Sequence, residues 1–162
     1  MNNMHPNEHL VEQYVRIKKK WFTITNIKLS RNREIDILAL DTNGNCYHIE
    51  VDIHKTGLQW GPEGKDHYTV KGYKEKKFNE EITNFIKTEF GVSTVHNIWV
   101  CWAIHPSKKQ LAFSEADKHG ITIWEFKEKV IELWNEIGTA HYGDDIIQAV
   151  SIIKKAIPLN RK

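Results

Sequence analysis

The feature that most limits how this chain can fold is a pair of apolar runs joined by Asn43-Gly44. The runs extend from Glu34 to Leu40 and from Cys46 to Ile53. Asparagine followed by glycine between such runs is the strongest short-range signal for a β-hairpin, because both residues tolerate the positive φ angles of a tight turn. A third strand is expected from Trp21 to Ile27, so the sequence predicts an antiparallel meander.

Helices and further strands are expected around this meander. Apolar residues at helical spacing predict a helix from Glu8 to Lys20 before it, and the polar, glycine-bearing segment from Lys55 to His67 after it predicts a long loop. The later elements follow from hydrophobic patterns and stop signals: a helix ending at Phe90, a strand from Asn97 to Ile104, a helix from Ser107 to His119, a strand from Ile121 to Phe126, and helices from Lys127 to Ile137 and from Asp145 to Ile157. The order α-β-β-β-α-β-α-β-α-α predicts one α/β domain over residues 1–162, with a mixed sheet and helices on both faces.

Composition and length agree with one globular domain. The 162 residues are 40% hydrophobic and 27% charged, which is enough to build a core without cross-links. Cys46 and Cys101 lie in apolar runs, so buried free thiols are expected and a disulfide framework is not. The first residues lack the pattern of a signal peptide, and no apolar run is long enough to span a bilayer. We therefore expect a cytoplasmic protein that does not bind membranes.

The net charge is only +2, which does not indicate a broadly basic surface for nucleic acid. A polyanion site must then come from a local cluster of basic residues. Two clusters are present, Lys18 to Lys20 and a second one made of Lys71, Lys74, Lys76 and Lys77 with Tyr68 and Tyr73 interleaved. A solvated helix face explains either cluster equally well. Within the second, Lys71, Lys74 and Lys77 are the candidates for contact with DNA.

Acidic residues on the two hairpin strands are the candidate site. In the second strand Glu50 and Asp52 alternate with apolar residues and share one face. In the first, Asp36 shares a face with apolar Leu38 and Leu40, so it is an acid among residues that favour burial. Carboxylates held close together resist ionisation unless a cation or a hydrogen-bond network compensates them, and Mg²⁺ prefers oxygen ligands. The pattern alone also fits a half-exposed antiparallel strand with a polar outer face.

A shared site for Asp36 and Glu50 depends on the register of the hairpin. With a two-residue turn at Asn43-Gly44 and an unbroken ladder, Asp36 faces Val51 and Glu50 lies on the opposite face. A longer loop or a β-bulge brings both acids to one face; a loop of residues 43–45, for example, places Asp36 opposite Asp52 and diagonal to Glu50. We therefore predict that the hairpin is not a simple two-residue turn.

The segment from Glu8 to Lys55 resembles the N-terminal half of the PD-(D/E)XK, or restriction endonuclease-like, nuclease superfamily, which includes Holliday junction resolvases and Mrr-like enzymes. The resemblance rests on EIDILAL, which supplies Asp36, and YHIEVD, which supplies Glu50. The acid on the family's first helix best matches Glu8, with Glu12 as second choice. The family's α-β-β-β-α-β core is completed by the next helix and by the strand IWVCWAI.

One position departs from the family pattern. The family places a lysine where this chain has Asp52, and that lysine helps to position and activate the attacking water. Some members carry Glu or Gln there, and Asp52 is alternatively a third metal ligand. Substitute lysines are Lys55, Lys65, Lys71 and Lys74, with Lys71 or Lys74 better placed than Lys55.

The resemblance implies a Mg²⁺- or Mn²⁺-dependent phosphodiesterase acting on DNA, with a partner subunit or a homodimer as the expected assembly. Asp36 and Glu50 are the implied metal ligands, Glu8 an outer or third ligand, and Asp52 a residue near the attacking water.

A non-catalytic nucleic-acid or protein interaction module on the same fold is the alternative, supported by the missing lysine. A third alternative is an unrelated α/β domain with a polar strand face. A zinc site built from His48, Glu50, Asp52 and His54 is disfavoured, because residues in succession on one strand face are too far apart to bind one ion.

Overall fold

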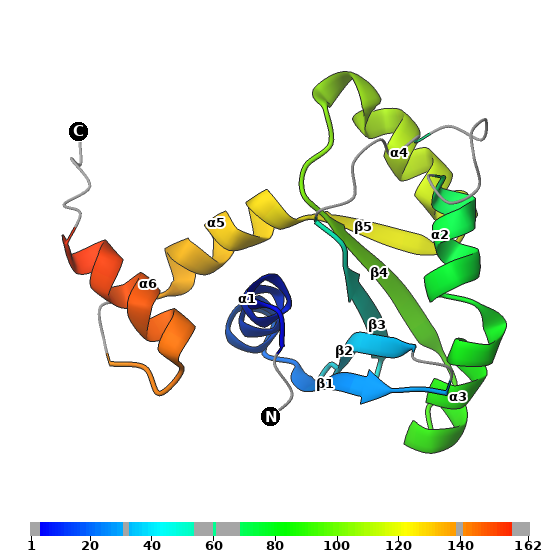
Figure 1. Ribbon diagram of the computed structural model, residues 1–162, viewed down its shortest axis with the longest axis horizontal. Helices are drawn as coiled ribbons and strands as arrows, with labels where there is room; N and C mark the ends of the chain where they lie inside the picture. Colours follow the sequence, from blue (N-terminus) through cyan, green and yellow to red (C-terminus); the bar gives the residue numbers. More distant parts are fainter. Residues whose placement is uncertain (1–3, 31–32, 54–59, 61–68, 139–140, 157–162) are drawn as a thin grey trace.

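The computed structural model describes residues 4–30, 33–53, 60, 69–138 and 141–156. Its centre is a five-stranded sheet in the order β1-β2-β3-β4-β5 (Figure 1). The strands are β1 (Phe22–Lys28), β2 (Glu34–Leu40), β3 (Cys46–Val51), β4 (Val95–Cys101) and β5 (Ile121–Glu125). The first three strands are antiparallel, whereas β4 lies parallel to β3 and β5 parallel to β4. The expected meander and mixed sheet are confirmed.

Helices cover both faces of the sheet, as expected (Figure 1). On one side lie α1 (Pro6–Tyr14), a π-helical turn η1 (Val15–Lys19), α5 (Phe126–Glu136) and α6 (Asp145–Ala156). On the other side lie α2 (Val70–Lys77), α3 (Glu80–Phe90) and α4 (Pro106–Lys118). The central strands bury both faces: Ile49 and Val100 pack toward α1 and α5, and Trp99 and Cys101 pack toward α2 and α4. The expected α/β class and the core order α-β-β-β-α-β are therefore present.

The hairpin between β2 and β3 has a three-residue loop. The N–H of Asp41 donates to the carbonyl of Asn45 at 3.1 Å, so residues 42–44 form the loop. Gly44 has φ of +81°, and the carboxylate of Asp41 accepts hydrogen bonds from the N–H groups of Asn43 and Asn45. The predicted departure from a two-residue turn is confirmed, although the loop starts one residue earlier than in the example considered from the sequence.

Two helices differ from the sequence expectations. The expected helix from Glu8 to Lys20 is α-helical only to Tyr14, continues as the π-helical turn, and ends at Lys20, whose φ is +61°. The helix expected to end at Phe90 is two helices, because the chain leaves helical geometry at Phe78 and the side chain of Asn79 caps α3 by accepting the N–H of Ile82.

Cys46 and Cys101 are buried free thiols, as expected. Among the described residues, no helix is both long and apolar enough to cross a membrane. Of the glycine-bearing segment, which was expected to be a long loop, only Trp60 lies within the described residues, and it packs against Trp99.

Candidate nuclease-type acidic site

Asp36 and Glu50 lie on the neighbouring strands β2 and β3, just beyond the end of their ladder. The ladder ends at the pair Ile37–Ile49, and Asp36 and Glu50 are the next residues beyond that pair on their strands. Both acids are buried, with 6% of Asp36 and 1% of Glu50 exposed. At the end of the ladder the N–H of Val51 donates to Oδ2 of Asp36 at 2.8 Å. The loop of residues 42–44 thus sets the register that brings two buried carboxylates to the same end of the ladder.

This burial changes the acid–base behaviour of Asp36. Desolvation, followed by the charge of Glu50, raises the pKa of Asp36 to about 7. The Lys77 ammonium and the hydrogen bond from Val51 act in the opposite direction but do not outweigh burial. A carboxyl group with this pKa is poorly compensated in its charged form, which is the condition in which an additional cation is stabilising.

Lys77 supplies the cationic group of the site. Its ammonium forms an ion pair with Oε2 of Glu50, and 28% of the Lys77 side chain is exposed. Burial lowers the pKa of Lys77, but the charges of Glu50, Asp36 and Asp52 outweigh burial and the pKa is raised. The lysine reaches the acids because it is in the last turn of α2, which packs on this face of the sheet. From the sequence Lys77 was predicted only as a DNA contact.

His48 engages the other oxygen of Glu50. Its Nε2 lies 2.8 Å from Oε1 of Glu50, and the histidine is completely buried, with its ring edge-to-face against Phe78 at 4.8 Å. His48 and Glu50 are two residues apart on one strand, so they share a face. The spacing of His48 and Glu50 is present in the sequence, but the sequence analysis considers these residues together only as zinc ligands and does not predict their hydrogen bond.

Glu8 and Asp52 lie at the edge of this group. The carboxylate of Glu8, at the start of α1, accepts the N–H of His5 at 3.3 Å, and its pKa is raised by burial and by Glu34 and Glu50. Asp52 follows β3, where its N–H donates to the carbonyl of Val100 at 3.0 Å, and its side chain is half-buried. Both acids therefore act electrostatically on the central group, since Glu8 raises the pKa of Asp36 and Asp52 raises that of Lys77.

The donor chemistry fits a hard divalent cation better than zinc. Asp36 and Glu50 offer only carboxylate oxygens, and Mg²⁺ is commonly held by one or two carboxylates together with waters and phosphate oxygens. In the described part of the chain, no three His, Cys, Asp or Glu side chains are grouped so that they could hold one ion. Asp36 and Glu50 therefore suit a site with two carboxylate ligands.

The predicted DNA-contacting lysines have different surroundings. Lys71 is exposed and lies 3.9 Å from Glu75, one helical turn away. Lys74 is half-buried on the same helix. Neither forms an ion pair with Asp36 or Glu50 among the described contacts, whereas Lys77 pairs with Glu50. Tyr73 also faces this region, because its buried ring stacks on Trp99 at 3.9 Å and the charges of Glu50, Asp52 and Asp36 add to the effect of burial in raising its pKa.

No model of a known protein family matches this sequence, and no curated protein matches it significantly. Among solved structures, the chain is similar to a repair endonuclease from Pyrococcus abyssi, with a TM-score of 0.44 and 18% sequence identity. The match covers 77% of this chain and 49% of the endonuclease chain, so it spans about half the length of that protein.

Proposed function

We propose that this protein is a metal-dependent phosphodiesterase of the PD-(D/E)XK type that cleaves DNA. The observation that supports the proposal is the pair of buried carboxylates, Asp36 and Glu50, at the same end of the ladder between adjacent strands and beside the ammonium of Lys77. Burying this much charge is costly for folding. Titratable groups whose pKa is strongly perturbed by burial and by a specific charge partner, as in Asp36, are typical of functional sites.

In this proposal each residue has a distinct role. Asp36 and Glu50 would hold Mg²⁺ or Mn²⁺, and such an ion would supply Lewis-acid polarisation of the phosphate and a bound water of lowered pKa. Lys77 takes the place of the family lysine, because it is the ammonium beside Glu50, and it stabilises negative charge on the phosphate. His48 fixes the carboxylate of Glu50 through its hydrogen bond. Glu8 and Asp52 add negative charge at the edge, where Asp52 faces the incoming water.

The test is cleavage of supercoiled plasmid, single-stranded DNA and branched DNA with Mg²⁺ or Mn²⁺, and with chelator in place of metal. We expect metal-dependent cleavage that Asp36→Asn and Glu50→Gln reduce to the level of the chelated sample. Glu89→Gln is the matched control, because Glu89 is an exposed acid on α3, away from the sheet. Full cleavage by both site variants would contradict the proposal.

A non-catalytic module is the second candidate, and one observation favours it. Both oxygens of Glu50 are engaged, one by His48 and one by Lys77, so the group is already charge-compensated on that side. DNA binding without cleavage, unaffected by metal, would support this candidate. Isothermal titration with Mn²⁺ separates the two, since only the phosphodiesterase requires metal binding that depends on Asp36.

A further inference from the structure

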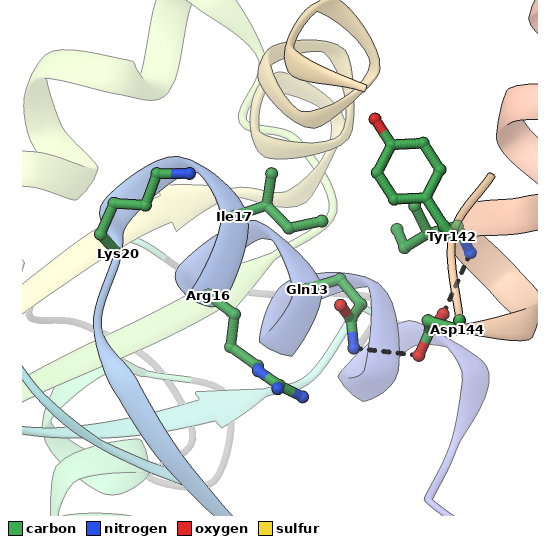
Figure 2. Close-up of a pocket in the computed structure, with 8 residues that line it drawn as sticks. Gln13, Arg16, Ile17, Lys20, Tyr142 and Asp144 are labelled. Carbon is green, nitrogen blue, oxygen red and sulfur yellow. Dashed lines mark hydrogen bonds between the residues drawn. The ribbon is translucent and has the colours of Figure 1, made fainter. Parts of the chain in front are cut away.

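A groove that contains basic residues lies at the end of the π-helical turn, beside the start of α6 and the start of edge strand β1. One hollow of about 580 Å³ runs between this turn and the start of α6, and Arg16, Lys20, Tyr142 and Asp144 are among its lining residues. Figure 2 shows Arg16 and Lys20 on one wall, with Tyr142 and Asp144 across from them. A second hollow of about 470 Å³ is lined by the same Arg16 and Lys20 together with residues 21–23. The two hollows adjoin at Arg16 and Lys20, and together they are called the groove.

Arg16 and Lys20 carry the positive charge of this groove. Arg16 is 57% exposed, and the carboxylate of Glu12 lies 3.8 Å away, beyond hydrogen-bonding distance. The neighbouring lysines are engaged elsewhere, since Lys18 pairs with Glu136 at 2.8 Å and Lys19 lies over the rings of Trp21 and Trp124. The sequence cluster from Lys18 to Lys20 therefore contributes one residue, Lys20, to the groove.

Asp144 is the acid in the first hollow, and among the described contacts it forms no ion pair with Arg16 or Lys20. Asp144 accepts hydrogen bonds from Gln13 at 3.1 Å and from the N–H of Ile147 at 3.0 Å, and it lies 2.6 Å from Nε2 of His9. An exposed aromatic ring completes the surface, because Phe22 is 65% exposed where edge strand β1 begins. Guanidinium and ammonium groups beside an exposed ring match a polymer of phosphates and bases.

We propose that this groove binds the phosphate backbone of a nucleic-acid strand, with phosphates at Arg16 and Lys20 and a base against Phe22. Glu8, Glu12 and Arg16 follow one another at four-residue intervals along one side of the helix. Arg16 therefore lies roughly 12 Å along the helix from Glu8, whose charge acts on Asp36. Two acids, Glu8 and Glu12, thus separate the groove from the acidic site along this side of the helix. The identity of the polymer rests on the proposed function, but the binding does not require cleavage.

The test is the salt dependence of DNA binding, measured by fluorescence anisotropy with a short labelled duplex and the corresponding single strand, in chelator so that nothing is cleaved. The variant is Arg16→Gln with Lys20→Asn. Asparagine is used at position 20 because it tolerates the φ of +61° found there. Each lost phosphate contact lowers the slope of log K against log salt by about 0.9 for duplex and about 0.7 for single strands. We therefore expect the slope to fall by roughly 1.8 or 1.4 in the double variant.

Lys87→Gln with Lys108→Gln is the matched control, because both lysines are exposed on the other face of the sheet and the same charge is removed. An equal change of slope in the control, an unchanged slope in the groove variant, or no binding by the unaltered protein would each overturn the proposal. Binding that depends on Arg16 and Lys20 in a protein that never cleaves DNA would uphold the groove and reject the phosphodiesterase. Thermal unfolding of both double variants verifies that each is folded.

Discussion

At the scale of single residues, the acidic site is a balance of charges that the sequence could only partly predict. Asp36 and Glu50 could be predicted because a strand pattern and a family resemblance both point to them. Lys77 could not be paired with Glu50, because the contact depends on how α2 packs and on where it ends, at the break before Asn79. The helical pattern in the sequence continues past that break, so it favoured Lys71 and Lys74, which are nearer the start of α2.

Replacement of Lys77 tests whether this residue supplies the charge of the missing family lysine. Lys77→Met should abolish metal-dependent cleavage, because it removes the ammonium beside Glu50. Addition of Asp52→Lys restores the family pattern and should return part of the activity. Cleavage rates are compared with those of Asp52→Lys alone. If the double variant stays inactive although it is folded, the role of Lys77 is limited to pairing with Glu50.

The same ion pair should be visible in stability. Lys77→Met leaves Glu50 buried without its cation, and Glu50→Gln leaves the ammonium without its acid, so each should destabilise the protein. The double variant should be less destabilised than the sum of the two, with a coupling of about 0.5–3 kcal/mol in a urea-unfolding cycle. Additive effects would show that the pair contributes nothing to folding.

Asp36 should affect stability in the opposite sense. The pKa of Asp36 is about 7 in the folded protein, above its usual value of 3.8, so the folded state binds the proton more tightly than the unfolded state does. In chelator, stability should therefore fall as pH rises from about 4 to about 7. Asp36→Asn removes this effect, so the variant should be more stable than the unaltered protein at pH above 7. The gain should be about 1.4 kcal/mol for each unit by which folding raises the pKa of Asp36.

Urea unfolding with chelator, at a pH below 4 and at a pH above 7, measures this gain. At low pH the difference should disappear, because Asp36 is then protonated in both states. The conservative substitution keeps an acceptor for the N–H of Val51. A variant that is less stable than the unaltered protein at high pH would mean that the charge of Asp36 is fully compensated by its neighbours.

At the scale of elements, one loop decides whether the site exists. The sequence identified the hairpin and also showed that a two-residue turn would separate Asp36 from Glu50, so the longer loop could be predicted from the requirement for a shared face. The π-helical turn and the division between α2 and α3 could not, because apolar residues continue at helical spacing across both. Tertiary packing determines where such breaks occur, and the hydrophobic pattern of one segment does not contain that information.

Gly44 provides a test of the loop geometry. Its φ of +81° strains any residue with a Cβ, while no atom lies within 4 Å of the place where a Cβ would be. Gly44→Ala should therefore cost about 1–2 kcal/mol from the backbone alone, and Gly44→Asn should cost less. Gly143→Ala is the control, because Gly143 also has open space around it but does not have a positive φ. Its free energy of unfolding should stay within about 0.5 kcal/mol of that of the unaltered protein. Equal losses for both alanine variants would show that the strain at Gly44 is absent.

At the scale of the whole molecule, α6 closes the layer that contains α1. Asp144 joins the two helices, since its Oδ1 accepts the N–H of Ile147 and caps α6, while its Oδ2 lies 2.6 Å from His9 of α1. Ile147 then inserts into the core beside α1 and α5. Burial raises the pKa of Asp144, but hydrogen bonds from Ile147 and His9 outweigh burial and the pKa is lowered. The contribution of Asp144 to stability should therefore be lost as pH falls through its folded-state pKa.

Substitutions at Asp144 should separate the cap from the link between helices. Asp144→Ala removes both and should cost about 1–2 kcal/mol, because the loss of an N-cap alone reaches that range. Asp144→Ser keeps a capping oxygen and loses the contact with His9, so it should cost less. Hydrogen exchange is the measurement that locates the effect: amides of α6 should exchange faster in the alanine variant, while those of β3 and β4 should slow or quicken only with global stability. If protection falls equally in α6 and in the sheet, α6 unfolds together with the sheet, and Asp144 stabilises the whole molecule and not only the attachment of α6 to α1.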